Sequence, residues 1–325
     1  MSDMDLKIGN VSVVGVGLVG SAWSAFLASR GIPVRLFDPA ADALRRGRMR
    51  AIEQFEFLRR HGLASAGVPE SAEGLLQAAS GLDEAAGEAD LVIEAAPERY
   101  DVKTPLFEAL DRAARPSCVL ASSSSGLLMT EIQQRLRHPE RALIAHPFNP
   151  VHLVPLVELV GGRRTDPGLL AQMKTFFDRL GKVAIIVRKE VPGHIANRLQ
   201  AAVWREAIHL VLEGVGSVAD VDQALTAGPG IRWALMGQHL IFHLGGGRGG
   251  TEYFLDHIGQ KFTPLWEDMA HWTEIPAAAK PLLVEGVQDE LRGRSLADAE
   301  PWRDAQLVAL LKLLYAPFRK SCSTR

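Results

Sequence analysis

A histidine and a glutamate occupy two neighbouring apolar segments of this chain. His146 follows an apolar run, and Glu158 is the only charge in Leu156-Val157-Glu158-Leu159-Val160. A carboxylate in an apolar strand is costly unless it is paired, and a histidine is the obvious partner. Glu158 would accept a ring N–H and leave the other ring nitrogen to take a proton from a hydroxyl. The alternative is that Glu158 faces solvent from a half-exposed strand.

Two further polar segments could hold a reacting oxygen. Ser122-Ser123-Ser124-Ser125-Gly126 follows the apolar run 118–121, and these serines could bind a substrate oxygen, although a turn with a helix N-cap fits the pattern equally. Asn197 stands in the first turns of a predicted helix. Its amide could donate to a carbonyl oxygen, or it could be an ordinary polar helix residue. The chain lacks a G-x-S-x-G motif, which argues against a hydrolase.

A glycine-rich turn near the N-terminus has the pattern of a dinucleotide site. Gly15-Val16-Gly17-Leu18-Val19-Gly20 joins a predicted strand to a predicted helix. There the glycines permit a tight turn, and the helix N-terminus provides N–H donors for a pyrophosphate. Asp38 ends the next predicted strand, where a carboxylate binds ribose hydroxyls and repels the extra phosphate of NADP. We therefore expect NAD, although Arg45 and Arg46 follow within two turns.

Glu98 and Lys103 follow the predicted strand 91–93. Turns that leave such strands lie at the carboxyl edge of a parallel sheet, where ligands bind. The two residues could contact the ribose or nicotinamide side of the cofactor. The alternative is an exposed ion pair at the start of a helix.

The elements that must position these residues alternate between strands and helices up to about residue 190. Val11–Val16, a helix over 18–30 and a strand over 33–37 make one βαβ unit, which is typical of a doubly wound Rossmann-type sheet. Beyond residue 190 the pattern is helical. We expect an α/β NAD-binding domain over 1–190 and an all-helical domain over 191–325. Further predicted strands are 91–93, 118–120, 142–144, 156–160 and 183–187, and further predicted helices are 40–61, 103–114 and 166–180.

Composition excludes several classes of protein. The 325 residues carry 36 Lys and Arg against 38 Asp and Glu, so no net field favours nucleic acid or anionic lipid. No apolar stretch approaches the roughly 20 residues of a membrane span. The two cysteines, Cys118 and Cys322, are too few for a thiolate metal site or a disulfide framework. We expect a cytoplasmic protein without a metal.

Taken together, these motifs resemble the 3-hydroxyacyl-CoA dehydrogenase superfamily over essentially the whole chain. The resemblance rests on GVGLVG, SSSSGLL, HPFNP, PLVELVGG and PGHIANRL, in that order. It implies NAD-dependent oxidation of a 3-hydroxyl to a ketone, with His146 as general acid/base and Glu158 as the residue that orients it. It further implies that Ser125 and Asn197 bind substrate. The cofactor contacts that it implies are Glu98, Lys103 and Ser123.

The substrate is expected to be a free hydroxy acid. Ser123 and the His-Pro start of the histidine motif depart from the acyl-CoA enzymes. The chain resembles most the branch that oxidises L-carnitine, and second the gulonate 3-dehydrogenase and lambda-crystallin branch. A short-chain L-3-hydroxyacyl-CoA substrate stays open, because the arginines between 45 and 60 could bind a coenzyme or simply form a solvated helical face. Another alternative is a non-catalytic, crystallin-like NAD-binding protein. The resemblance also implies a homodimer formed through the helical domain.

A quaternary ammonium group cannot donate hydrogen bonds and is usually held by aromatic faces. Core packing would equally explain the aromatic residues of the chain. A substrate carboxylate would require a base, for which Arg232 or Arg198 could serve. The aromatic candidates are Phe148, Trp233, Tyr253 and Phe254.

Overall fold

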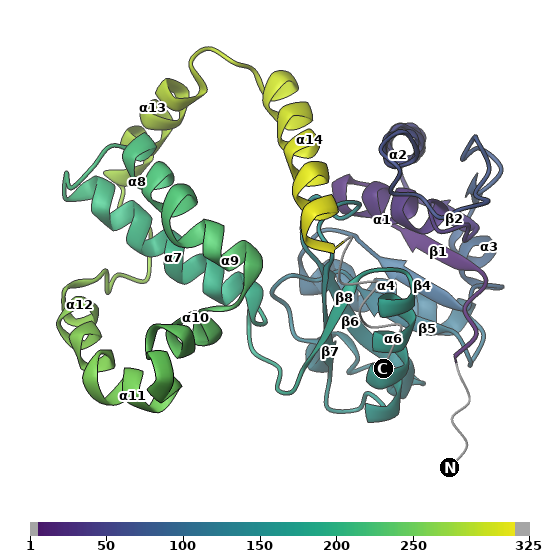
Figure 1. Ribbon diagram of the computed structural model, residues 1–325. Helices are drawn as coiled ribbons and strands as arrows, with labels where there is room; N and C mark the ends of the chain where they lie inside the picture. The colour runs from purple at the N-terminus through teal and green to yellow at the C-terminus, as the bar shows by residue number, and fades with distance from the viewer. Residues whose placement is uncertain (1–5, 316–325) are drawn as a thin grey trace. The chain divides into compact units, whose positions relative to one another are not determined.

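The short apolar segments of the first part of the chain form one eight-stranded sheet in the computed structural model (Figure 1). The structure describes residues 6–315, so Cys322 lies outside the described residues. The strand order is β3-β2-β1-β4-β5-β6-β7-β8. The strands are β1 (Val11–Val14), β2 (Val34–Phe37), β3 (Leu76–Ala78), β4 (Leu91–Glu94), β5 (Val119–Ser122), β6 (Ala142–Pro147), β7 (Leu156–Gly161) and β8 (Val183–Val187).

Helices cover both faces of this sheet, which explains why every residue of β1, β4 and β5 is buried. One face packs against α1, α2 and α6 through side chains such as Trp23, Phe55 and Phe177. The other face packs against α3, α4 and α5 through side chains such as Phe107 and Met129. The helices are α1 (Leu18–Ala28), α2 (Ala41–Arg60), α3 (Leu82–Ala86), α4 (Tyr100–Ala113), α5 (Met129–Ile132) and α6 (Pro167–Arg179).

The predicted α/β Rossmann-type fold is confirmed, with two differences in detail. Strand β3, a three-residue strand at the edge of the sheet that pairs in parallel with β2, was not predicted. A change of strand direction was not predicted either. Strands β1 to β6 are parallel, whereas β7 runs antiparallel to β6 and β8 is parallel to β7.

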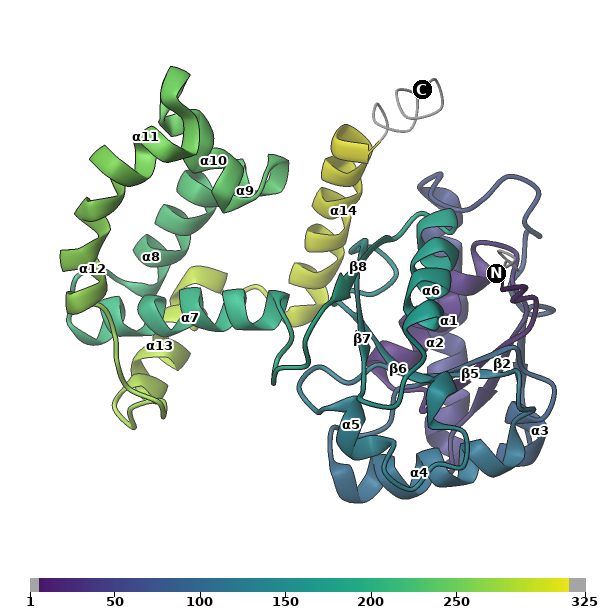
Figure 2. The same cartoon turned by 90° about the horizontal axis from the view of Figure 1, so that it is seen from below.

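The rest of the chain up to residue 315 contains helices and no strand, as expected. Contacts divide the molecule into two compact units, 1–198 and 199–325. In the second unit α8 packs against α13, and α10 packs against α11. Figure 2 shows α10, α11 and α12 following one another in an arc. The helices are α7 (Ala196–Leu212), which begins in the first unit, α8 (Val218–Leu225), α9 (Ile231–Leu235), α10 (Gln238–Gly245), α11 (Gly250–His257), α12 (Thr263–Asp268), α13 (Ala279–Leu291) and α14 (Leu296–Tyr315).

Short turns of other helix types complete the fold. None of the helices within residues 6–315 combines the length and the apolarity that are needed to cross a membrane. The 3-10 turns are η1 (Pro139–Arg141), η3 (Gly247–Gly249) and η4 (Gly259–Phe262), and the single π turn in the described part of the chain is η2 (Thr226–Gly230).

Candidate active site

His146 and Glu158 meet at the carboxyl end of β6. They are directly opposed in the antiparallel pairing of β6 with β7, which places both side chains on the same face of the sheet. The Nδ1 atom of His146 lies 2.9 Å from Oε2 of Glu158, and both side chains are buried. Burial opposes ionisation of Glu158, but the hydrogen bonds from His146 and from two backbone N–H groups hold the pKa of this carboxyl below its ordinary value. An ionised carboxylate only accepts, so Nδ1 carries the ring proton and Nε2 is left as a base.

The second oxygen of Glu158 binds the start of α7. Its Oε1 accepts the backbone N–H groups of Ile195 at 2.9 Å and Ala196 at 3.0 Å, which are donors that the first turn of the helix cannot satisfy itself. The next residue is Asn197, whose Nδ2 donates to the carbonyl of Ser125 at 3.0 Å. The structure therefore links all four residues that the sequence proposed for catalysis, His146, Glu158, Asn197 and Ser125.

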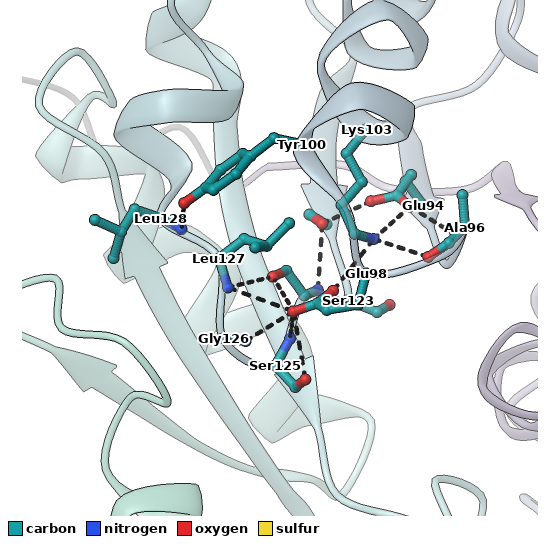
Figure 3. Close-up of polar contacts among 12 residues, drawn as sticks. Glu94, Ala96, Glu98, Tyr100, Lys103, Ser123, Ser125, Gly126, Leu127 and Leu128 are labelled. Atoms are coloured by element: carbon teal, nitrogen blue, oxygen red, sulfur yellow. Dashed lines mark hydrogen bonds and ion pairs between the residues drawn. The ribbon is translucent and has the colours of Figure 1, made fainter. Parts of the chain in front are cut away.

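The serine turn after β5 is held by Glu98, as Figure 3 shows. The Oε1 atom of Glu98 accepts the hydroxyl of Ser124 at 2.7 Å and the backbone N–H groups of Ser125 and Gly126, each at 2.8 Å. Burial opposes ionisation here too, but these bonds and the nearby Lys103 ammonium hold the pKa of Glu98 below its ordinary value. Glu98, which the sequence suggested as a cofactor contact, thus binds the turn that presents Ser125.

Lys103 pairs with Glu94 next to this turn (Figure 3). Its Nζ is 2.7 Å from Oε1 of Glu94 and donates to the carbonyl of Ala96 at 3.0 Å. Glu94 also accepts the hydroxyl of Ser122 at 2.6 Å, which joins the carboxyl ends of β4 and β5. The two charged side chains are 1% and 0% exposed, so this ion pair is buried. Lys103 also lies 3.7 Å from Oε2 of Glu98, which is 39% exposed, so the ion pair of these two residues that the sequence left open is present as well. Glu94 was not among the predicted site residues, although it too is a charge at the end of an apolar strand.

The glycine-rich turn fits a pyrophosphate. Gly15 has a φ of +88°, and a Cβ there would lie 2.7 Å from the backbone of Ala95. A Cβ on Gly20 would lie 1.9 Å from the carbonyl oxygen of Gly15, whereas a Cβ on Gly17 would meet nothing within 4 Å. Helix α1 starts at Leu18 without a side-chain cap or an acidic residue in its first turn. Its N–H donors and the open space over Gly17 are therefore free to receive an anion.

Asp38 lies beside this turn, at the carboxyl end of the neighbouring strand β2. Its carboxylate accepts the backbone N–H of Val16 and that of Ala40, each at 3.0 Å. Further along the same edge, the hydroxyl of Ser123 accepts Nε1–H of Trp23 from α1 at 3.1 Å. Of the other predicted cofactor contacts, Leu18 is exposed in the first turn of α1 and Val19 packs partly against the core. These residues fit NAD: the glycine-rich turn would hold the pyrophosphate, and Asp38 would bind a ribose hydroxyl.

Two residues at these sites, Gly47 and His194, were not predicted from the sequence. Gly47 of α2 packs against the glycine-rich turn, where a Cβ would lie 2.1 Å from the carbonyl oxygen of Val16. His194 lies against His146, with 5.3 Å between their ring centroids. No spacing rule exposes either residue, because both act by touching a segment distant in sequence.

The aromatic candidates separate into two groups. Phe148 contacts the His146 ring edge to face, with 5.5 Å between centroids. Phe254 is buried and stacks on Phe242, as expected of a core residue. Tyr253 stacks on His257, and Trp233 is partly exposed on α9. Only Phe148 among the four contacts a predicted catalytic residue within the described structure.

The fold and this site define an NAD-dependent dehydrogenase that acts on a CH–OH group. The chain belongs to the 3-hydroxyacyl-CoA dehydrogenase family: residues 10–191 match the model of its NAD binding domain, and residues 193–281 match that of its C-terminal domain.

Comparison with characterised proteins agrees with this assignment. The chain is 41% identical over 302 residues to an L-carnitine dehydrogenase of Streptomyces griseus, with 93% of this chain and 89% of that protein covered. It is 39% identical to an L-carnitine dehydrogenase of Pseudomonas aeruginosa, with 94% of each chain covered.

Two solved structures show the same fold. A 5-formyl-3-hydroxy-2-methylpyridine 4-carboxylic acid 5-dehydrogenase, an NAD+ dependent dismutase, is 26% identical with a TM-score of 0.80, over 95% of this chain and 99% of the other. FadB2 of M. tuberculosis is 30% identical with a TM-score of 0.66, over 86% and 94% of the two chains.

Proposed function

We propose that this dehydrogenase oxidises the 3-hydroxyl of L-carnitine to a ketone. The observation that carries the chemistry is the buried pair of His146 with Glu158, which leaves Nε2 of His146 as a base at the carboxyl edge of the sheet. Support for the substrate comes from the relatives that cover most of the chain at 36–41% identity and are named L-carnitine dehydrogenases.

His146 is the general base of this reaction. As the C–O bond of the substrate becomes a carbonyl, Nε2 of His146 takes the hydroxyl proton. When bound, NAD accepts the hydride that leaves the same carbon. Glu158 stabilises the imidazolium that forms, since its ionised carboxylate stays 2.9 Å from Nδ1.

Ser125 and Asn197 hold the substrate oxygen in this proposal. The Asn197 amide keeps a second N–H for the substrate, because it uses only one for the carbonyl of Ser125. The hydroxyl of Ser125 makes a long hydrogen bond, 3.4 Å, to Oε1 of Glu98, and in this proposal it turns from Glu98 to the substrate oxygen. Donors at that place polarise the carbonyl in the reverse reaction. Glu98, Lys103 and Ser123 act with the glycine-rich turn and Asp38 at the cofactor edge. Glu98 and Lys103 do so by holding the serine turn and the ends of the strands.

The trimethylammonium group of L-carnitine is stabilised by an aromatic neighbour. Phe148 can serve as this neighbour, because its ring lies against His146 and is only partly buried. A cation near an aromatic face is stabilised by about 0.5–2 kcal/mol, which is enough to favour carnitine over an uncharged hydroxy acid.

The experiment that tests this function measures NADH formation from NAD with a panel of four substrates, compared as kcat/KM. The panel is L-carnitine, L-gulonate, L-3-hydroxybutyrate and a short L-3-hydroxyacyl-CoA. Preference for L-carnitine is the expected result. Preference for the acyl-CoA would contradict the substrate assignment, and no turnover of any of the four would favour a non-catalytic NAD-binding protein.

The same proposal includes the oligomeric state, the cellular location and the domain bounds of the enzyme. The enzyme works as a homodimer in the cytoplasm, with an NAD-binding domain over 1–190 and a helical substrate and dimerisation domain over 191–325. Large apolar side chains exposed on the helical unit, among them Trp204, Leu244 and Trp266, support a partner surface. Sedimentation equilibrium tests the dimer. The substrate is a small molecule, and neither nucleic acid nor a membrane is part of the proposal.

A further inference from the structure

His194 joins the two halves of the candidate active site. Its Nε2 lies 3.1 Å from the carbonyl oxygen of Ser124, and its ring lies 5.3 Å from that of His146, centroid to centroid. The side chain is only 1% exposed. A carbonyl can only accept, so Nε2 carries the proton and donates to the serine turn.

The backbone at this position turns the imidazole inward. His194 has a φ of +51° and is one of two non-glycine residues with positive φ in the described part of the chain. This conformation is costly for a residue with a side chain and persists only where the surroundings impose it. Ile195 and Ala196, which follow it, are held by Glu158, so the strain lies beside the catalytic pair.

The pKa of His194 lies below its ordinary value in this environment. Burial lowers the pKa of His194, and the adjacent His146 acts in the same direction. The hydrogen bond with Ser124 and the carboxylates of Glu158 and Glu98 oppose this shift without cancelling it. The Nδ1 atom of His194 is buried and has no hydrogen-bond partner among the described residues. Buried polar atoms normally have a hydrogen-bond partner, so packing alone does not explain a buried histidine with one unsatisfied nitrogen.

We propose that His194 is a positioning residue for hydroxyl oxidation: it fixes the serine turn, which carries Ser125, relative to the imidazole of His146. The inference rests on the proposed function. A substrate oxygen held by Ser125 must also reach Nε2 of His146, so the separation of these two groups decides how often a bound substrate is in line for proton transfer. Loss of alignment by about an ångström can lower the rate by as much as a hundred-fold.

Two substitutions test this role. Asparagine tolerates positive φ but is too short to reach the carbonyl of Ser124, whereas glutamine places an N–H donor near the position of Nε2. We expect His194→Asn to lower kcat for L-carnitine by about ten- to a hundred-fold, with a smaller change in KM and with NADH affinity within two-fold of wild type. His194→Gln should recover most of the lost kcat. The matched control is His152→Asn, at another buried histidine, which packs against Phe57 of α2.

A measurement that needs no substrate separates this inference from the function itself. In protein labelled with ¹⁵N-histidine, the ring nitrogen signals of His146 should move in His194→Asn and stay in place in His152→Asn. Wild-type protein that oxidises none of the panel would contradict the proposed function alone, because the signals still report the position of His146. The inference would be overturned by unchanged signals, by a His194→Asn kcat within two-fold of wild type, or by a His194→Gln variant no better than the asparagine one.

Discussion

Glu158 binds the imidazole of His146 with one carboxylate oxygen and the first N–H groups of α7 with the other. One residue thus sets the tautomer of the base and also fixes the start of α7, the helix that carries Asn197. Substitution by glutamine separates these two roles, because the glutamine carbonyl can still accept from the start of α7 but its NH₂ cannot accept from Nδ1 of His146.

Glu158→Gln should remove most of the activity while leaving the fold in place. The carbonyl of glutamine can still accept from Ile195 and Ala196, so its NH₂ faces Nδ1 of His146 and forces the proton onto Nε2. A protonated Nε2 cannot accept the substrate proton. We expect kcat to fall by about 10²–10⁴-fold with unchanged NADH binding, measured by steady-state kinetics and fluorescence titration. Glu158→Ala, which loses the helix cap as well, should in addition unfold at a lower temperature. Retention of more than a tenth of kcat in Glu158→Gln would contradict the assigned tautomer.

Gly47→Ala should weaken NAD binding from outside the glycine-rich turn. The Val16 peptide is fixed on both sides, since its N–H binds Asp38 and its carbonyl oxygen would lie 2.1 Å from a Cβ at position 47. In an exposed helix, alanine in place of glycine stabilises by about 1 kcal/mol. Here the steric conflict should reverse the sign and raise the Kd for NADH by about ten-fold, with a destabilisation of about 1–3 kcal/mol. Gly74→Ala, where a Cβ would meet nothing within 4 Å, is the control and should change neither quantity.

Lys103→Met should act first on stability. It leaves the carboxylate of Glu94 buried without its cation, which costs about 3–5 kcal/mol and is measurable by urea denaturation. Lys174→Met is the matched control, because the Lys174–Asp178 pair is exposed on α6 and contributes about 1 kcal/mol or less. A large rise in the Kd for NAD with normal stability would instead show that Lys103 acts chiefly by touching the cofactor.

Lys182 should make stability depend on pH above neutrality. Its Nζ donates to the carbonyl of Val154 at 2.9 Å and lies 4.3 Å from the ring centroid of Phe26, and no carboxylate of the described residues contributes to its pKa shift. Burial, with a smaller contribution from Arg30, lowers the pKa of Lys182 from 10.5 to about 7. Between these pH values the unfolded chain binds more protons than the folded one. The contribution of Lys182 to the free energy of unfolding therefore increases as pH rises.

The measurement is urea denaturation of wild type and Lys182→Gln between about pH 6 and pH 9, where the difference between the two should change by up to about 1.4 kcal/mol per pH unit. A wild-type stability that falls relative to the variant as pH rises would contradict a neutral Lys182.

Much of the fold follows from local patterns in the sequence. Buried strands such as β1 and β4 are mostly apolar and contain several β-branched residues, so their positions are clear without a structure. The edge strand β3 was not predicted, because Leu76-Gln77-Ala78 has only one buried residue and shows no alternation of apolar and polar residues. Its strand character comes from pairing with β2.

The candidate site divides in the same way. The sequence alone determined the residue types: a carboxylate that needs a partner, a histidine to supply it, and a glycine turn between strand and helix that suits a pyrophosphate. Tertiary structure decided how these residues meet. Only the reversal of β7 sets Glu158 opposite His146, and only the packing of distant segments buries Lys103 on Glu94 and brings His194 and Gly47 to the site. The physical reason is that local propensity acts over a few residues, whereas strand direction, register and burial are set by contacts between segments far apart in the chain.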